Sequence, residues 1–129
     1  ARVHAGKLRG AVHVGLAPIA QDVVICGQDR SQIGALIFVG DAMGAVADGG
    51  ALVGDALLDA VRARLGALAE SSTGSSTRIA RALVCAEPPS IEDQGITAKG
   101  DLNARKVQTR RADLVARIYD DKDRAVVLV

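Results

Sequence analysis

The stretch that decides the fold is Asp22-Val23-Val24-Ile25-Cys26, followed after a polar turn by Gly34-Ala35-Leu36-Ile37-Phe38-Val39. Both runs are rich in aliphatic and β-branched residues and are bounded by glycine, which predicts two β-strands. They are apolar almost throughout, as is typical of strands that are covered on both faces. The connection between them is short enough for an antiparallel hairpin. The sequence therefore predicts a strand pair buried inside the domain.

Helices and one more strand are predicted around this pair. Apolar residues recur at helical spacing in three stretches, residues 7–16, 56–69 and 101–120. The inward residues of the second are Leu57, Val61, Leu65 and Leu68, and those of the third are Leu102, Val107, Leu114, Ile118 and Tyr119, with Asp101 as its N-cap. Residues 79–86 read as a third strand. Since the elements do not alternate strictly, we expect a small α+β domain in which a three-stranded, mostly antiparallel sheet packs with about three helices.

Two stretches are predicted to lie outside this framework. Residues 40–54 contain five glycines but no Gly-Lys-Ser/Thr, so we interpret them as a surface loop and not as a phosphate-binding loop. Residues 124–129 have the composition of a strand, but the sequence indicates no partner for them. We accordingly expect one domain at residues 1–121 and a tail at 122–129.

Composition restricts the class of function. The 129 residues correspond to about one domain, and 49% of them are hydrophobic, which predicts a packed core. The net charge of +1 lacks the strong field of a dedicated binder of nucleic acid or membrane surfaces. Phe38 and Tyr119 are the only aromatic residues, so no platform for base stacking is expected. No apolar run reaches 18 residues, which argues against a membrane-spanning helix.

The cysteines and histidines indicate neither a disulfide nor a metal. Cys26 and Cys85 lie in apolar runs and are expected to be buried, reduced thiols of a cytoplasmic protein. His4 and His13 have no cysteine or acid at zinc-site spacing, so no metal site is expected. The chain begins at Ala1 without an initiator methionine, and we interpret it as a piece of a longer protein.

The best candidate for chemistry is Thr97-Ala98-Lys99-Gly100, which ends a long irregular segment and directly precedes the last predicted helix. A lysine beside glycine can extend its ammonium, and the amides of a helix start add positive potential, so the site suits a phosphate or carboxylate oxygen. A solvated surface lysine is the alternative. A solvated helix face is also the interpretation of the remaining basic group, Arg105, Lys106, Arg110, Arg111 and Arg117.

Three stretches of the chain carry a resemblance to one family. They are residues 3–9 (Val-His-Ala-Gly-Lys-Leu-Arg), residues 17–27 with 34–38, and residues 74–83 with 86–91 and 96–100 (Ile-Thr-Ala-Lys-Gly). Together they resemble the small C-terminal domain of AMP-forming acyl-CoA synthetases, in the adenylate-forming superfamily. The form Thr-x-Lys-Gly is closest to the branch of feruloyl-CoA-synthetase-like aryl-CoA ligases.

The resemblance implies an acid–CoA ligase whose N-terminal adenylation domain would be the partner of this chain. In such enzymes a carboxylic acid reacts with ATP and Mg²⁺ to give an acyl-adenylate and pyrophosphate, and the acyl group then passes to the thiol of CoA; the resemblance to the feruloyl-type branch implies a hydroxycinnamate as the acid. Lys99, followed by Gly100, would bridge the carboxylate and the α-phosphate. After a rotation of the domain, the face near Gly6 would form part of the CoA site. The chain alone would be inactive and would bind neither substrate tightly.

The sequence also departs from the family pattern. Ala98 stands where an acid is common in this branch, and Leu102 and Asn103 occupy the positions at which the broad family usually has a basic residue. Arg105 follows six positions after Lys99, so no role is assigned to it.

Two other classes of function remain open on the sequence. One is a small α+β module that binds RNA through the arginines of the last helix, and salt-dependent binding to single-stranded RNA would support it. The other is a structural domain whose valine-rich tail adds a strand to a partner protein. The near-neutral charge and the scarcity of aromatic residues weigh against RNA.

Overall fold

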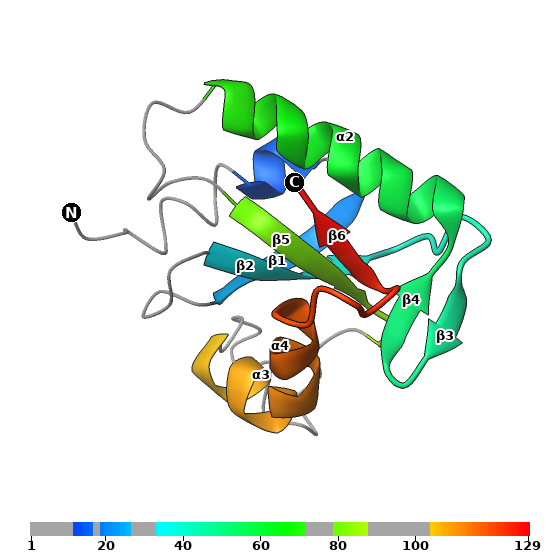
Figure 1. Cartoon of the computed structure of the whole chain (residues 1–129), viewed down its shortest axis with the longest axis vertical. Coiled ribbons are helices and arrows are strands. Elements are labelled where there is room, and N and C mark those ends of the chain that lie inside the picture. The colour runs from blue at the N-terminus through cyan, green and yellow to red at the C-terminus, as the bar shows by residue number, and fades with distance from the viewer. Residues whose placement is uncertain (1–11, 17–18, 27–32, 72–78, 88–103) are drawn as a thin grey trace.

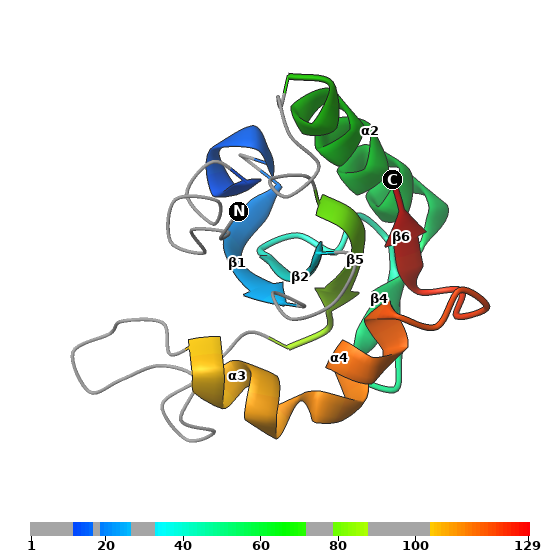
Figure 2. The ribbon, with the colours of Figure 1, turned by 60° about the vertical axis from the view of Figure 1, so that its left-hand side comes forward.

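A computed structural model describes residues 12–16, 19–26, 33–71, 79–87 and 104–129. In these parts a mixed sheet lies between two layers of helices (Figure 1). Helix α2 (Asp55–Ser71) and the helical residues 12–16 cover one face. Helices α3 (Ala104–Arg110) and α4 (Ala112–Ile118) cover the other face (Figure 2). The α+β class is as predicted.

The sheet is larger than the three strands that the sequence predicts. Strand β1 (Ala20–Cys26) pairs antiparallel with β2 (Ile33–Val39), and β2 pairs in parallel with β5 (Ile79–Cys85). The far edge of β5 pairs with both β4 (Ala51–Val53) and β6 (Val126–Leu128), and β3 (Val46–Asp48) pairs with β4. The described sheet thus has six strands, and of its pairings only β2–β5 is parallel.

The apolar strands are buried on both faces, as their sequences predict. Val23 and Ile25 of β1 point into the layer under α2, whereas Val24 and Cys26 point into the layer under α3 and α4. Strands β2 and β5 alternate in the same way. Because every second side chain meets a different helical layer, none of these positions needs to be polar.

The glycine-rich segment 40–54 is not wholly a loop, and that prediction is wrong. It contains the hairpin β3–β4, in which Asp48 pairs with Ala51 and Val46 with Val53. The two residues of the turn, Gly49 and Gly50, have φ of 59° and 94°. Positive φ at both positions is the geometry of a tight hairpin turn, and glycine adopts it without steric cost.

The last predicted helix, residues 101–120, is interrupted where the structure describes it. Helix α3 ends at Arg110, Arg111 leaves the helical conformation with φ −112° and ψ 36°, and α4 begins at Ala112. Val107, Leu114 and Ile118 are buried as predicted, and Tyr119 is partly buried. Leu102 and Asp101 lie outside the described residues.

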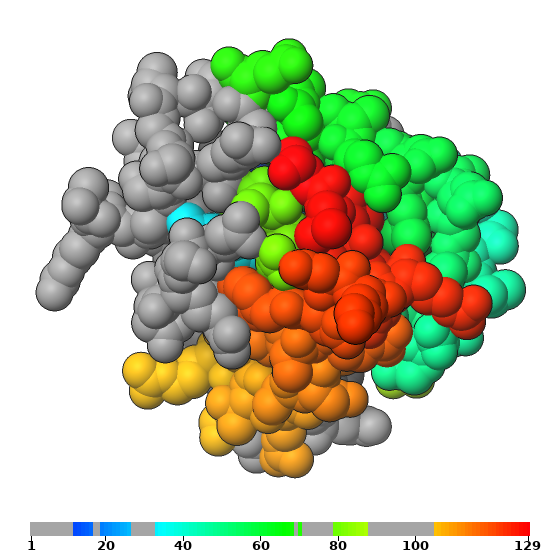
Figure 3. Space-filling model, viewed as in Figure 1, coloured from blue at the N-terminus to red at the C-terminus, as the bar shows by residue number. Residues whose placement is uncertain are grey.

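Helix α2 and the C-terminal tail complete the domain. Leu57, Val61 and Leu65 of α2 are buried and Leu68 is partly buried, which confirms the predicted stripe. The tail residues Val126–Leu128 form a strand, and its partner is β5 of the same chain. Figure 3 shows β6 lying between α2 and α4. Among the helices that the structure describes, none is long and apolar enough to cross a membrane.

Candidate functional site

The predicted site residues Lys99, Gly100 and Gly6 lie outside the described residues. The structure does describe the residues that flank the segment carrying Lys99 in the sequence. That segment leaves the sheet after Glu87, two residues beyond β5, and the chain is described again from α3 onward. The contacts that hold these two ends are therefore the described contacts nearest in sequence to Lys99.

Arg111, between α3 and α4, contacts both strands of the parallel pair. Its Nη1 donates a hydrogen bond of 2.7 Å to the carbonyl of Glu87. Its guanidinium lies 5.2 Å from the centroid of the Phe38 ring, within the range of a cation–π interaction, and it also interacts with the thiol of Cys85. Arg111 is partly exposed, so it is not confined to the solvated face that the sequence predicts, and its contacts also join the helices to the ends of β2 and β5.

A second set of contacts fixes α3 and the end of β5. The side-chain amide of Gln108 donates to the carbonyl of Ile25 at 3.2 Å, which ties α3 to β1. The N–H of Ala86 donates to the carbonyl of Gly50 at 2.8 Å, which ties the exit of β5 to the β3–β4 turn. The chain is thus held on the sheet immediately before and after the segment that carries Lys99.

Arg117 of α4 is also predicted to lie on a solvated helix face, but in the structure its side chain is partly buried and is 22% exposed. It donates from Nε and Nη2 to the two carboxylate oxygens of Asp123, at 2.6 and 3.1 Å, and from Nη1 to the carbonyl of Asp48 at 2.7 Å. This hydrogen bond to Arg117 lowers the pKa of Asp123, and the pKa of Arg117 is raised in turn. Arg117 therefore joins α4 to the β3–β4 turn.

The rest of the predicted basic group stays at the surface. The side chains of Arg105, Lys106 and Arg110 are exposed on α3, which contains no acidic residue. This agrees with the predicted solvated face for these three residues. The structure assigns no contact role to Arg105.

The two thiols are buried and reduced, as the sequence predicts. Burial raises the pKa of Cys26 to about 12 and that of Cys85 to about 11, although the Arg111 guanidinium acts in the opposite direction on Cys85. A nucleophilic cysteine needs a lowered pKa and access to solvent. Neither residue is therefore a candidate for covalent chemistry.

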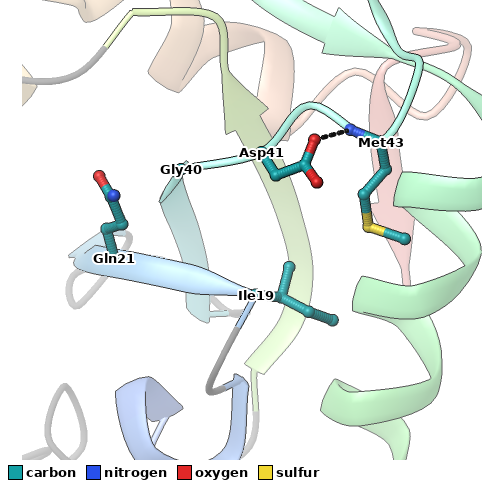
Figure 4. Close-up of a pocket in the computed structure, with 5 residues that line it drawn as sticks. All are labelled: Ile19, Gln21, Gly40, Asp41 and Met43. Carbon is teal, nitrogen blue, oxygen red and sulfur yellow. Dashed lines mark hydrogen bonds between the residues drawn. The ribbon is translucent and has the colours of Figure 1, made fainter.

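An open groove lies between the start of β1 and the β2–β3 connection, lined by Ile19, Gln21, Gly40, Asp41 and Met43 (Figure 4). Its one carboxylate, Asp41, already accepts a hydrogen bond from the N–H of Met43 at 2.9 Å, and Met43 has φ 52° and is 41% exposed. The groove brings together no set of polar groups for catalysis. In the described parts of the chain, no cluster of three or more His, Cys, Asp or Glu residues could hold a metal ion.

A sequence profile of the AMP-binding enzyme C-terminal domain matches residues 2–123. The chain belongs to this family. The match spans nearly the whole chain, including the predicted lysine segment and the helices that follow it. No curated protein sequence matches the chain.

Solved structures give this C-terminal domain the same fold. One is the A-PCP didomain of the carboxylic acid reductase from Segniliparus rugosus in complex with AMP, with 22% identity, a TM-score of 0.69, and coverage of 92% of this chain and 16% of that chain. Another is the A domain of that reductase in complex with AMP and a co-purified carboxylic acid (20%, 0.69, 94% and 18%). A third is the adenylation domain of the carboxylate reductase from Mycobacterium chelonae (20%, 0.69, 92% and 18%). The domain therefore corresponds to less than a fifth of each of these chains.

Sequence reasoning missed Arg111, although the sequence carries a signal for it. Val107, Leu114 and Ile118 form the inward stripe of the last helical segment, and position 111 falls on that same stripe at i+4 from Val107. An arginine on an inward face must place its guanidinium against acceptors or an aromatic ring. The identity of those partners, Glu87 and Phe38, could come only from the tertiary structure.

Proposed function

We propose that this domain is the lysine-bearing C-terminal part of an ATP-dependent, AMP-forming acid–CoA ligase. The observation that carries the proposal is the family match over residues 2–123. The likeness in fold to adenylation domains bound to AMP, and in one case to a carboxylic acid, supports it. The large N-terminal adenylation domain would supply the pockets for the nucleotide and the acid, and the parent enzyme would work in the cytoplasm.

Lys99 would act in the first half-reaction. Its ammonium would bridge the carboxylate of the acid and the α-phosphate of ATP, with Gly100 leaving room for the approach. A fixed cation at this point stabilises the charge on the oxygens of the in-line transition state as pyrophosphate leaves. Loss of such a preorganised donor costs about 3 kcal/mol, or about a hundredfold or more in rate. The magnesium ion of the nucleotide would neutralise the phosphate charge that Lys99 does not reach.

The second half-reaction would use another face of the domain. After adenylation the domain would rotate, withdraw Lys99 and bring Gly6 next to the path of the CoA thiol. A glycine there would leave space that a side chain would block. A hydroxycinnamate as the acid rests on the resemblance of residues 97–100 to the feruloyl-type branch, because the pocket that selects the acid would lie in the N-terminal domain.

The test separates the two half-reactions in the parent enzyme. We expect Lys99→Ala to lower adenylation, followed as pyrophosphate release, by about a hundredfold or more. Thioester formation from preformed acyl-adenylate should stay within about threefold of the wild type. The matched control is Lys122→Ala, since Lys122 is an exposed lysine on the turn before β6. Equal losses in both half-reactions, or turnover of ATP, CoA and hydroxycinnamate by the isolated domain, would argue against the assignment.

A further inference from the structure

Positive charge is concentrated on helix α3. The helix and the residue after it, positions 104–111, contain four of the sixteen basic residues of the chain and none of its fifteen acidic residues. The rest of the chain therefore has twelve basic and fifteen acidic side chains. In Figure 2, α3 lies at the end of its helical layer away from β6. The net charge of +1 thus conceals one distinctly basic element.

The helical geometry places three of these cations on one side. Successive residues of an α-helix are rotated by about 100°, so Arg105, Lys106 and Arg110 lie within an arc of about 140°. All three are exposed. The opposite side of α3 faces the sheet, where Val107 is buried and the side chain of Gln108 donates a hydrogen bond to β1. The packing of the helix therefore fixes the outward direction of the cations.

These charges contribute little to the fold. In the described part of the chain, the side chains of Arg105 and Arg110 make no ion pair or hydrogen bond. Lys106 and Arg110 are four positions apart on α3, where like charges destabilise a helix. On α2, by contrast, Arg62 pairs with Asp59 three positions away. A basic face that costs helix stability is expected of a surface that serves a partner.

The character of this face favours an acidic protein surface as the partner. Small anions are held in concave sites with convergent polar groups, whereas side chains on the convex side of a helix diverge. Nucleic-acid bases stack on exposed rings, but Phe38 is buried and Tyr119 is partly buried. Membrane surfaces take up apolar side chains next to the cations, and none of the large apolar side chains exposed in the described residues belongs to α3.

We propose that the outer face of α3, through Arg105, Lys106 and Arg110, docks reversibly on an acidic surface of the large N-terminal domain of the parent enzyme. The inference rests on the proposed function, which supplies that domain and the rotation of this one against it. A face that is covered in one orientation and exposed in another must stay hydrated when exposed. Charged side chains meet this requirement, and contacts between domains of one chain are accordingly more polar than permanent interfaces. Complementary charge also speeds the encounter of the two surfaces.

The experiment maps the partner of this face in the parent enzyme. The photoreactive residue p-benzoylphenylalanine replaces Thr109, which is exposed on α3 between the cations, and mass spectrometry identifies the residue to which it cross-links. The measurement is repeated with Arg105→Glu/Arg110→Glu and at two salt concentrations. The matched control is Arg62→Glu/Lys122→Glu, which changes the net charge equally at two exposed cations outside α3. Circular dichroism checks that each variant folds.

We expect position 109 to cross-link to the large domain of the same chain, next to aspartate or glutamate residues. Because the Debye length falls from about 10 Å at 0.1 M salt to about 3 Å at 1 M, the yield should fall by about threefold or more between these concentrations. Arg105→Glu/Arg110→Glu should lower the yield by about tenfold or more, since like charges then face each other, and the control should stay within about twofold. If the double variant does not fold, Arg105→Gln and Arg110→Gln decide, each with a loss of about twofold or more.

Several results would overturn the inference. A cross-link to a second copy of the chain, or none to the large domain, would exclude the proposed partner. A yield that neither salt nor charge reversal changes would exclude the basic residues as its cause. Salt-dependent binding of single-stranded RNA that is lost in Arg110→Glu would make this face an RNA-binding surface instead. Failure of the proposed function is distinguishable, because it appears as absent pyrophosphate release, whereas a cross-link to the large domain can still be mapped.

Discussion

Replacing Asp123 by asparagine tests the strongest ion pair described in this domain. Asp123 accepts hydrogen bonds from Nε and Nη2 of Arg117, at 2.6 and 3.1 Å, and from the N–H of Ala125 at 2.9 Å. The side chains of Arg117 and Asp123 are 22% and 12% exposed. The pair is bidentate and partly buried, so it should contribute far more than an ordinary surface ion pair.

The magnitude follows from what asparagine can retain. The amide keeps the shape and one acceptor oxygen but loses the charge and one of the two acceptors facing Arg117. A hydrogen bond to a charged group contributes about 1.5–3 kcal/mol, so we expect the free energy of unfolding to fall by about 2 kcal/mol at pH 7. For a chain of this size, that corresponds to a decrease in melting temperature of about 8 °C.

The effect should also depend on pH in a defined direction. Because Arg117 lowers the pKa of Asp123 in the folded state, the carboxylate stabilises the fold above its ordinary pKa of about 3.9. That contribution is lost as the pH falls from there through the lower, folded-state pKa. The difference between wild type and Asp123→Asn should therefore be constant between about pH 7 and 5 and shrink below about pH 4.

Urea unfolding followed by circular dichroism at several pH values measures both quantities. The control is Asp59→Asn, which removes the exposed ion pair between Arg62 and Asp59 on α2 and should cost less than about 0.5 kcal/mol. A loss at Asp123 no larger than that of the control would refute the reasoning. So would a difference that persists unchanged down to about pH 2.5, since it could not come from the charge of Asp123.

Two further predictions concern backbone conformation and thiol chemistry. Gly50→Ala should lower the free energy of unfolding by about 1–2 kcal/mol, because Gly50 has φ 94°. Gly66→Ala, in the interior of α2 where an added Cβ meets open space, should instead raise the free energy of unfolding by about 0.5–1 kcal/mol. Urea titrations of both variants give the comparison, and a stabilising Gly50→Ala would contradict the turn geometry. Cys26 and Cys85 should resist alkylation by iodoacetamide in the folded protein at pH 8 and react only in urea, since burial raises their pKa values to about 12 and about 11. Mass spectrometry counts the alkylated thiols. Rapid labelling of the native protein would contradict this prediction, because it would show that the thiols are accessible.

The parts of the fold that the sequence predicts are those that depend on local pattern. The runs at residues 22–26 and 34–39 are apolar because both faces of β1 and β2 are covered by helices, so the sequence of each run is enough to predict that burial. The stripe of Leu57, Val61 and Leu65 likewise records the buried face of α2. These features can be predicted from the sequence because the spacing of apolar residues reflects which side of each strand or helix is buried.

The errors arise where a short element depends on a distant partner. Strands β3 and β4 have three residues each, and their glycine content favours a loop, although Gly49-Gly50 between Val46-Ala47-Asp48 and Ala51-Leu52-Val53 is a recognisable hairpin signal. Strand β6 pairs with β5, more than 40 residues earlier, which no local pattern can reveal. The helix break at Arg111 is hidden because the apolar stripe continues across it.

The functional proposal draws on both kinds of information. The proposed role of Lys99 rests on its sequence motif and on the family match, since the residue lies outside the described parts of the chain. What the structure adds is the framework at the start of its segment. The carbonyl of Glu87 is held by Arg111, and the N–H of Ala86 is held by Gly50.

The two elements that the sequence did not predict are the ones that hold this exit. The turn that holds Ala86 is itself held by Arg117, through the carbonyl of Asp48, and the helix break places Arg111 beside Glu87. Arg111, between α3 and α4, thus holds Glu87 directly, whereas Arg117 of α4 acts on Ala86 through the β3–β4 turn. The chain that leaves β5 is therefore held from two sides, and neither contact follows from a local pattern, because Arg111 and Glu87 are 24 positions apart and Arg117 and Asp48 are 69 positions apart.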